Sequence, residues 1–213
     1  MSLEQGLDAG LERLGLTLDE TAQRRLLDYL ALMLKSNKVY NLTAVRTPDK
    51  MLILHLLDSL AVKPHLVGTR LIDVGTGAGL PGIPLAIADP ALQVTLLDSN
   101  HKKTVFLRQA CLELGIGNAS VVCERVEAWR PTEKYDTVIS RAFSDLAEFA
   151  GVARHLCRDD GAMLAMKGVY PHEEISRLPP QVRLQRVIAL DVPGLDAERH
   201  LVEIRPVGPE AQA

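Results

Sequence analysis

Three glycines at alternate positions lie in the most informative stretch of the sequence, LIDVGTGAGLPG, at Gly75, Gly77 and Gly79. Glycine adopts positive φ easily and lets a ligand approach the backbone, because it has no Cβ. Gly77, Gly79 and Gly82 also satisfy the pattern G-x-G-x-x-G, which binds nucleotide phosphates where a strand turns into a helix. The spacing therefore indicates a turn that can cradle a nucleotide or nucleoside, although a purely structural turn remains an alternative.

An acid follows the glycines at the spacing that a ribose requires. Asp98 ends the next apolar run, 21 residues after Gly77, where a carboxylate can accept hydrogen bonds from ribose hydroxyls. In the alternative interpretation, Asp98 with Ser99 and Asn100 only caps the helix that follows. Both interpretations can hold together if Ser99 or Asn100 caps the helix while Asp98 points inward. The pair of features favours a nucleoside cofactor.

Another acid, Asp73, lies two residues before the first glycine. It can order the loop or attract a cationic amino group. S-adenosylmethionine is a nucleoside that carries an ammonium and a sulfonium and has no pyrophosphate. A dinucleotide enzyme, in contrast, normally needs a further domain for its substrate, and the roughly 145 residues after Gly68 are used up by one sheet. The acids therefore favour a methyl donor, and a nicotinamide-binding regulatory module is the alternative from another class.

The end of the third expected strand adds Arg125, Val126 and Glu127. An apolar side chain beside an acid suits adenine, because the adenine face packs and its amino group donates a hydrogen bond. The start of an exposed helix explains these residues equally well.

Basic and amide side chains are expected at the carboxyl ends of the strands, where open α/β sheets bind ligands. Arg141 follows a buried strand directly, so its guanidinium must find a carboxylate, a phosphate or a base edge. The other candidates for an anionic partner are Asn37, Lys38, Asn41, Lys102, Lys103, Lys167, Arg199 and His200. Lys102 and Lys103 begin a helix, where the dipole disfavours cations, but simple solvation is an equal alternative.

The composition excludes several classes of protein. The 24 basic and 27 acidic side chains give a net charge of −3, which excludes a polycationic nucleic-acid coat but not a local basic patch. His55, Asp58 and Ser59 lie on one expected helix and cannot form a hydrolase triad. No cysteine or histidine near His55 completes a metal site. Three isolated cysteines and the absence of a long apolar run predict a soluble, reduced, cytoplasmic protein.

The elements that position these residues change in type near residue 68. Before it, helices are expected over Leu3–Leu14, about Leu18–Lys35 and about Pro48–Val62, with a loop over Ser36–Arg46. After it, strands and helices alternate, which predicts a parallel sheet covered on both faces. The expected strands are Arg70–Val74, Gln93–Leu97, Ser120–Cys123, Thr137–Ser140 and Ala162–Met166, and the expected helices are Gly82–Ala88, Lys102–Leu114, Val126–Trp129 and Asp145–Leu156.

The last two expected strands, Val182–Leu190 and His200–Arg205, lack a crossover helix between them. They predict an antiparallel hairpin at one edge of an otherwise mostly parallel, Rossmann-like α/β sheet. We therefore expect a helical extension over residues 1–67, packed on a domain of residues 68–213 as one unit.

Sequence strings across nearly the whole chain resemble one family. The strings are NLTAV, HLLDSL, LIDVGTGAGLPGIPLAI, LLDSNHKKTVFLRQ, VISRAF, MKG and ERHLV. They resemble the bacterial 16S ribosomal RNA guanine-N7 methyltransferases of the G type, also called glucose-inhibited division protein B. The trailing L-P-G-I-P is more specific than a general methyltransferase motif, and Ala78 stands where relatives carry proline.

The resemblance implies a class I S-adenosylmethionine-dependent methyltransferase that acts on N7 of a guanine in the decoding region of 16S ribosomal RNA in the small subunit. It implies cofactor contacts at Gly75, Leu80, Val126, Glu127 and Arg141, with Asp98 as the ribose partner; Asp73, Gly77, Gly79 and Ser99 complete the candidate set. Arg141 thereby changes from a phosphate binder to a residue beside the cofactor that positions the base.

Guanine N7 carries a free lone pair, so no general base is expected. We also expect a monomer without metal or membrane contacts, with Tyr40 and Phe143 near the target base. A small-molecule methyltransferase with the same cofactor site is the alternative within this class.

Overall fold

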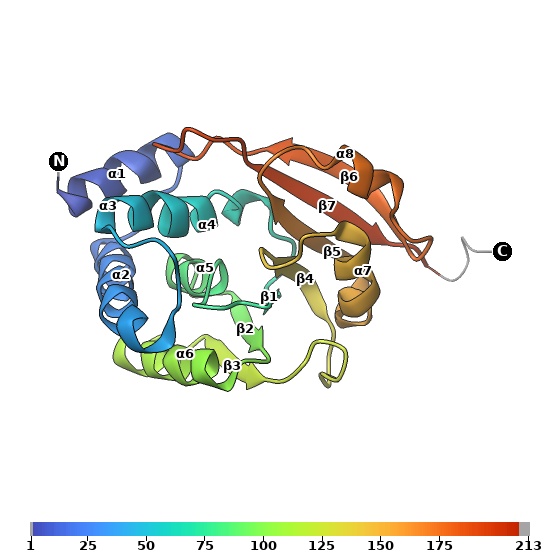
Figure 1. The fold of residues 1–213 in the computed structure, drawn as a ribbon, viewed down its shortest axis with the longest axis horizontal. Coiled ribbons are helices and arrows are strands. Elements are labelled where there is room, and N and C mark those ends of the chain that lie inside the picture. The colour runs from blue at the N-terminus through green and yellow to red at the C-terminus, as the bar shows by residue number, and fades with distance from the viewer. Residues whose placement is uncertain (1, 209–213) are drawn as a thin grey trace.

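Seven strands form one sheet in the computed structural model, which describes residues 2–208 (Figure 1). Their order is β3-β2-β1-β4-β5-β7-β6, and only β7 runs against its two neighbours. The strands are β1 (Arg70–Val74), β2 (Gln93–Asp98), β3 (Ala119–Cys123), β4 (Tyr135–Ser140), β5 (Cys157–Lys167), β6 (Val182–Ala189) and β7 (His200–Pro206). The predicted mostly parallel sheet with an antiparallel edge hairpin is confirmed.

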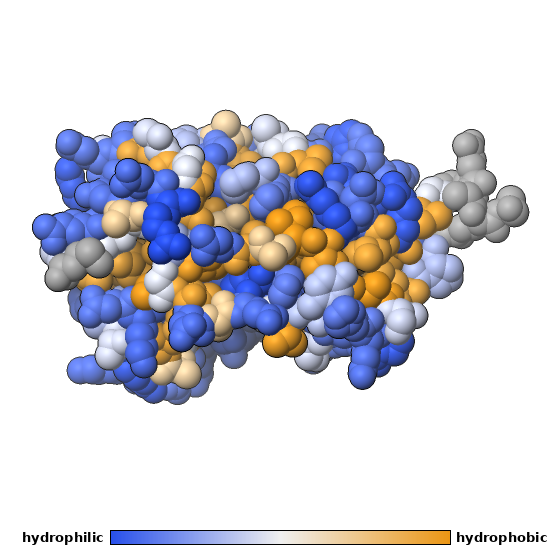
Figure 2. Space-filling view, turned by 90° about the horizontal axis from the view of Figure 1, so that it is seen from above, coloured by the Kyte–Doolittle hydropathy of each residue, from blue (hydrophilic) through white to orange (hydrophobic). Residues whose placement is uncertain are grey.

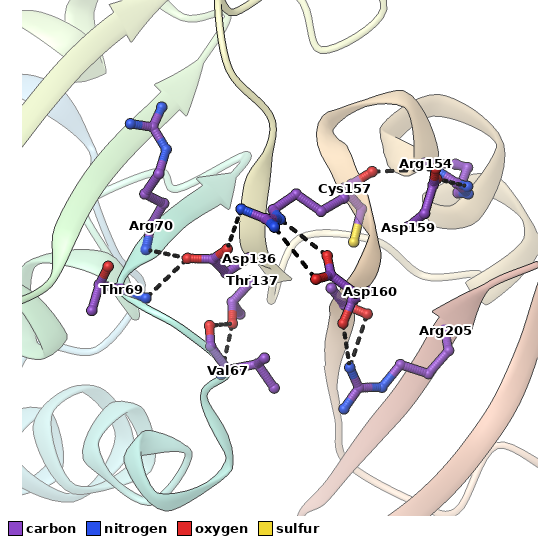
Figure 3. Close-up of polar contacts among 12 residues, drawn as sticks. Val67, Thr69, Arg70, Asp136, Thr137, Arg154, Cys157, Asp159, Asp160 and Arg205 are labelled. Atoms are coloured by element: carbon purple, nitrogen blue, oxygen red, sulfur yellow. Dashed lines mark hydrogen bonds and ion pairs between the residues drawn. The ribbon is translucent and has the colours of Figure 1, made fainter. Parts of the chain in front are cut away.

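Strand β5 is longer than the predicted Ala162–Met166, because it begins at Cys157. The polar residues Arg158–Asp160 interrupt the apolar run, but Cys157 before them pairs with Tyr135 across a bulge in the ladder between β4 and β5. Side-chain ion pairs fasten this amino-terminal edge of the sheet (Figure 3). The carboxylate of Asp136 accepts hydrogen bonds from the backbone N–H groups of Thr69 and Arg70 and pairs with Arg158.

Most helical segments, from α1 to α6, pack on one face of the sheet, and α7 packs on the opposite face (Figure 1). The helical segments are α1 (Leu3–Leu14), α2 (Glu20–Tyr40), α3 (Pro48–Met51), the π-helix η1 (Leu52–Leu57), α4 (Asp58–Leu60), η2 (Lys63–His65), α5 (Gly82–Ala88), α6 (His101–Glu113), α7 (Leu146–Ala153), η3 (Arg154–Leu156) and α8 (His172–Ser176). A capping box at Ser2 starts α1, and Gly15 ends it in the left-handed conformation that glycine adopts easily.

Two sequence predictions in the helices are wrong. Ser36–Tyr40 continues α2 and is not a loop, because Asn37 is buried and turns its amide onto the backbone of Thr43. The helix then ends at Asn41, which adopts positive φ. Val126–Trp129 forms a turn and not a helix, since its bonds return only to the carbonyl of Arg125.

The alternating side chains of the central strands belong to two cores. Leu71, Leu96 and Leu164 pack with residues of α1–α6, whereas Ile72 and Leu97 pack against α7 on the opposite face. The first core therefore joins the N-terminal helices directly to the sheet.

The outer surface mixes polar and apolar side chains. Figure 2 shows hydrophilic residues over much of one face, with hydrophobic ones reaching the surface between them. Within residues 2–208, no helix combines the length and apolarity needed to cross a membrane.

Candidate active site

The glycine loop leaves β1 and turns into α5 over the carboxyl end of the sheet. Gly77 has φ +62°, and a Cβ built there would meet no atom closer than 3.9 Å, so its outer face is open to a ligand. Gly79 has φ +100°, and its Cβ would lie 2.5 Å from Ile83, so it allows the loop to pack on α5. The backbone N–H groups of Gly75 and Thr76 both donate to the carbonyl of Leu97, which fixes the loop against β2.

Asp73 holds this loop from below. Its Oδ2 accepts hydrogen bonds from the hydroxyl of Thr76 at 2.6 Å and from the N–H of Gly82 at 2.8 Å. Burial raises the pKa of this carboxyl from 3.8 to about 6, against the lowering effect of these two bonds. Its Oδ1 is buried without a hydrogen-bond partner among the described residues. Asp73 thus places a buried carboxylate under the loop, held by two hydrogen bonds and stabilised in its charged form by the nearby Arg141.

Asp98 joins the end of β2 to the same loop. Its Oδ2 accepts from the N–H of Gly77 at 2.9 Å, and its Oδ1 accepts from the N–H of Asn100 at 2.8 Å. Asn100 in turn caps α6 by accepting from the N–H groups of Lys102 and Lys103. The combination predicted from the sequence is therefore present: Asn100 caps the helix while Asp98 faces the glycines.

A cavity of about 290 Å³ opens between the ends of β1, β2, β3 and β4. Its lining combines apolar side chains with acids that can accept hydrogen bonds from a nucleoside. The lining residues are Val74, Gly75, Leu97, Asp98, Ser99, Lys103, Glu124, Arg125, Val126, Glu127, Ala142 and Phe143. Sequence reasoning separated Val126 and Glu127 from the glycine loop by about 50 residues, and the fold brings them to one cavity.

A second cavity, of about 170 Å³, adjoins the first and shares Gly75 and Ala142 with it. Its other lining residues are Leu42, Thr43, Thr76, Gly77, Ala78, Leu80 and Arg141. The two cavities lie on either side of the glycine turn. An elongated ligand can therefore place a nucleoside in the first cavity and a charged tail in the second.

Arg141 projects from the end of β4 toward the N-terminal helices. Its Nη1 donates to the carbonyl of Leu54 at 3.1 Å and lies 3.4 Å from Oδ2 of Asp58. The other oxygen of Asp58 accepts from Nε of Arg199 at 3.0 Å. Asp58 is 2% exposed. From the sequence, Asp58 was considered only for a triad. Its contacts with the two arginines were missed because Arg141 lies 83 positions and Arg199 lies 141 positions after Asp58 in the chain.

The loop after α2 forms the remaining wall beside Arg141. The side chain of Asn37 holds the backbone of Thr43 through both amide atoms, at 2.9 and 3.0 Å. The hydroxyl of Thr43 lies 2.9 Å from Nε2 of His55 on the π-helix. Burial lowers the pKa of His55, and its Nδ1 has no partner among the described residues. Thr43 was not identified from the sequence.

The basic and amide candidates for RNA contact separate into a solvent-accessible group and a group bonded within the protein. Lys38, Asn41 and Lys102 are exposed, and Lys103 lines the first cavity. The others make contacts within the protein, and these are Asn37, Lys167, Arg199 and His200. The Lys167 ammonium is the clearest case, with three acceptors: the carbonyls of Phe143 and Ser144, and Oε2 of Glu174 at 2.7 Å.

The two aromatic candidates also differ. Phe143 lines the first cavity and packs on Phe149 with ring centroids 5.4 Å apart. Tyr40 packs on Phe106 in the first core, with centroids 6.3 Å apart, and is not among the cavity residues.

The residues present fit S-adenosylmethionine. The buried carboxylate of Asp73 lies beneath the loop that separates the two cavities, and Gly77 leaves room for close approach to the backbone. Carboxylates at Asp98 and Glu127 can accept from ribose hydroxyls and from an adenine amino group. In the part of the chain that the structure describes, no group of three or more histidine, cysteine or acidic side chains is arranged to hold a metal ion.

Known proteins similar to this chain share one description. Residues 22–202 match the family described as rRNA small subunit methyltransferase G. The chain is 56% identical to the ribosomal RNA small subunit methyltransferase G of Laribacter hongkongensis, over 96% of this chain and 99% of that protein. It is 58% identical to the protein of the same name from Chromobacterium violaceum, over 93% and 95%.

Solved structures support the fold independently of close sequence similarity. A SAM-dependent methyltransferase from Aquifex aeolicus superposes with a TM-score of 0.54 at 17% identity, covering 71% of this chain and 91% of that one. The predicted class I methyltransferase fold is confirmed.

Proposed function

The chain belongs to the rRNA small subunit methyltransferase G family, and from this premise we propose that it methylates N7 of one guanine in the decoding region of 16S ribosomal RNA. It is an S-adenosylmethionine-dependent methyltransferase. The observation that carries the site assignment is the glycine turn between two joined cavities, with Asp98 bonded to Gly77 on one side and Arg141 on the other.

The first cavity takes the adenosine part of the cofactor. Asp98 accepts from the ribose, Glu127 accepts from the adenine amino group, and Val126 packs on the base face. The second cavity takes the methionine part beside Arg141. The full proposed set is Asp73, Gly75, Gly77, Gly79, Leu80, Asp98, Ser99, Val126, Glu127 and Arg141. Asp73 and Gly79 act through the loop, since both are buried beneath it.

The cofactor supplies an electrophilic methyl group on a sulfonium. Guanine N7 has a free lone pair, so the protein needs no side chain to remove a proton first. The protein's contribution is to align N7 with the methyl group and exclude water, and orientation of this kind can lower a barrier by about 7–11 kcal/mol. Arg141 holds the base beside the cofactor by donating from its guanidinium.

Exposed Lys38, Asn41 and Lys102 contact the phosphate backbone around the target, with Lys103 at the mouth of the cofactor cavity. Lys167 and Asn37 contribute indirectly, because their polar groups are bonded inside the protein. His200 begins β7 opposite Lys167, and together with the preceding Arg199 it completes the RNA surface.

Residues 1–67 form an extension that packs on the methyltransferase domain of residues 68–213, and the protein works as a monomer in the cytoplasm. The shared core supports the first part of this proposal, as does the hydroxyl of Tyr29, which donates to the carbonyl of Ala78 in the glycine loop at 2.7 Å. The extension thereby helps to shape the cofactor site.

Ribosomal RNA from a strain that lacks the gene tests this function. Mass spectrometry of its 16S RNA should show one N7-methylguanine missing, and the gene supplied in trans should restore it. Unchanged methylation would exclude the proposed reaction. A metabolite as substrate would show itself by turnover that is indifferent to salt, whereas RNA binding weakens steeply as salt rises.

A further inference from the structure

The buried carboxylate of Asp58 binds two arginines that come from distant parts of the chain. Arg141 follows β4 at the cofactor site, and Arg199 immediately precedes β7. We propose that Asp58 is a positioning residue that makes these two guanidinium groups act as one unit on the RNA substrate. This inference rests on the proposed function and adds a residue to its machinery.

Hydrogen bonds as well as charge attraction hold the two guanidinium groups in place. Oδ1 of Asp58 meets Nε of Arg199 at 3.0 Å, and Oδ2 meets Nη1 of Arg141 at 3.4 Å. Nη1 of Arg141 also donates to the carbonyl of Leu54, and Nη1 of Arg199 donates to the carbonyl of Glu198. Arg199 is therefore held through two of its nitrogens, whereas Arg141 is held through Nη1 alone, which lies between two acceptors.

The arrangement leaves charge and donors for a substrate. Two guanidinium groups share one carboxylate, so the cluster keeps one net positive charge. An arginine has five N–H donors. The hydrogen bonds found among residues 2–208 use only Nη1 of Arg141 and only Nε and Nη1 of Arg199. The remaining donors suit a phosphate or a base edge of the nucleotide at the site.

Asp58 lies where an irregular helix of the N-terminal extension meets the cofactor side of the site. It directly follows the π-helix η1, whose Leu54 carbonyl is an additional acceptor for Arg141. Irregular turns of this kind are frequent at functional sites. Arg141 also lines the cofactor cavity. Asp58 thus connects the cofactor side of the site to the start of β7, which the sheet alone would not do.

The chain offers a matched control for a buried carboxylate with two arginines. Glu203 on β7 is 1% exposed and pairs with Arg186 at 2.7 Å and with Arg205. It lines neither of the two cavities. The variants Asp58→Asn and Glu203→Gln remove the same charge and keep nearly the same shape, so they separate positioning from general stability.

The experiment measures methyl transfer to small-subunit ribosomal RNA and RNA affinity with S-adenosylhomocysteine bound. We expect D58N to lower kcat/KM for RNA at least tenfold and to weaken RNA binding, while E203Q stays within twofold of the wild type. R199A should lower kcat as well as raise KM, because Asp58 then loses the guanidinium that fixes its carboxylate in place, and Arg141 is held less firmly by it. In a protein that already carries D58N, adding R199A should lower kcat/KM for RNA by less than a further threefold.

Several outcomes would overturn the positioning role. One is wild-type kinetics in D58N, and another is losses that multiply fully in the double variant. If D58N does not fold, R199A still decides the matter, because a rise in KM with unchanged kcat means that Arg199 acts independently. Absence of methyl transfer by both the wild type and E203Q would instead remove the proposed function itself.

Discussion

Replacing Asp73 by asparagine removes a buried charge from beneath the glycine loop but keeps the loop's anchors. The N–H of Gly82 and the hydroxyl of Thr76 both donate to Oδ2, so one amide oxygen in the same place can accept both bonds. The amide nitrogen then occupies the position of Oδ1, which has no hydrogen-bond partner among the described residues. The substitution therefore tests the charge separately from the geometry.

The expected size of the effect follows from the pKa of Asp73. Burial raises this pKa from 3.8 to about 6, so the folded state binds the proton more tightly than the unfolded state does. The cost of ionising Asp73 is absent below the unfolded pKa and grows as pH rises to the folded pKa. At about 1.4 kcal/mol per pKa unit, it reaches about 3 kcal/mol above pH 7. Roughly 2 kcal/mol of this arises between pH 4.5 and pH 7.5.

Urea unfolding of both proteins across this pH range measures the effect. The free energy of unfolding of D73N minus that of the wild type should increase by about 2 kcal/mol from pH 4.5 to pH 7.5. A constant offset is expected as well, because a buried amide N–H without an acceptor costs about 1–3 kcal/mol. A difference that stays flat, or falls with pH, would mean that ionising the buried Asp73 does not destabilise the folded state.

The same variant should bind S-adenosylmethionine about tenfold more weakly at pH 7.5, because the cationic ligand loses a nearby negative charge. Calorimetry measures this. Equal affinity would mean that Asp73 serves the loop alone.

Three further predictions concern the loop and the RNA surface. Gly77→Ala should cost about 1 kcal/mol in stability from its positive φ and lower cofactor affinity at least tenfold, whereas Gly15→Ala, which has a similar φ and open space, should leave affinity unchanged in calorimetry. Tyr29→Phe should lower the free energy of unfolding by about 1–2 kcal/mol and weaken cofactor binding, since a buried carbonyl loses its donor; equal affinity would separate the extension from the site. Lys102→Ala should reduce the slope of log K against log salt for RNA binding by about 1, whereas Lys167→Ala should reduce stability and leave that slope unchanged.

Local patterns predicted the parts of the molecule that depend on neighbouring residues. The bounds of β1, β2 and β3 agree with the prediction to within one residue, because these strands are short runs, mostly apolar, between polar or glycine residues, whereas β5 begins five residues earlier than predicted. The glycine turn and the cap at Asn100 follow from the conformational freedom of glycine and the short side chain of asparagine.

Contacts between distant segments were beyond these patterns. Asn37 looked like a helix breaker until burial and its bonds to Thr43 showed why α2 continues past it. The bridge from Asp58 to Arg141 and Arg199 depends on the packing of three segments, which no spacing in the sequence encodes. An internal acceptor likewise distinguishes a structural lysine from one that is free to contact RNA.

The proposed methyl transfer is tested most directly with purified protein, small-subunit ribosomal RNA and S-adenosylmethionine with an isotopically labelled methyl group. Digestion of the RNA to nucleosides and mass spectrometry identify the labelled product. If the protein is the proposed methyltransferase, label appears in N7-methylguanosine from a single position of the 16S RNA, and none appears without the protein. Label on another atom or base, or transfer of no label to this RNA, would contradict the proposed reaction.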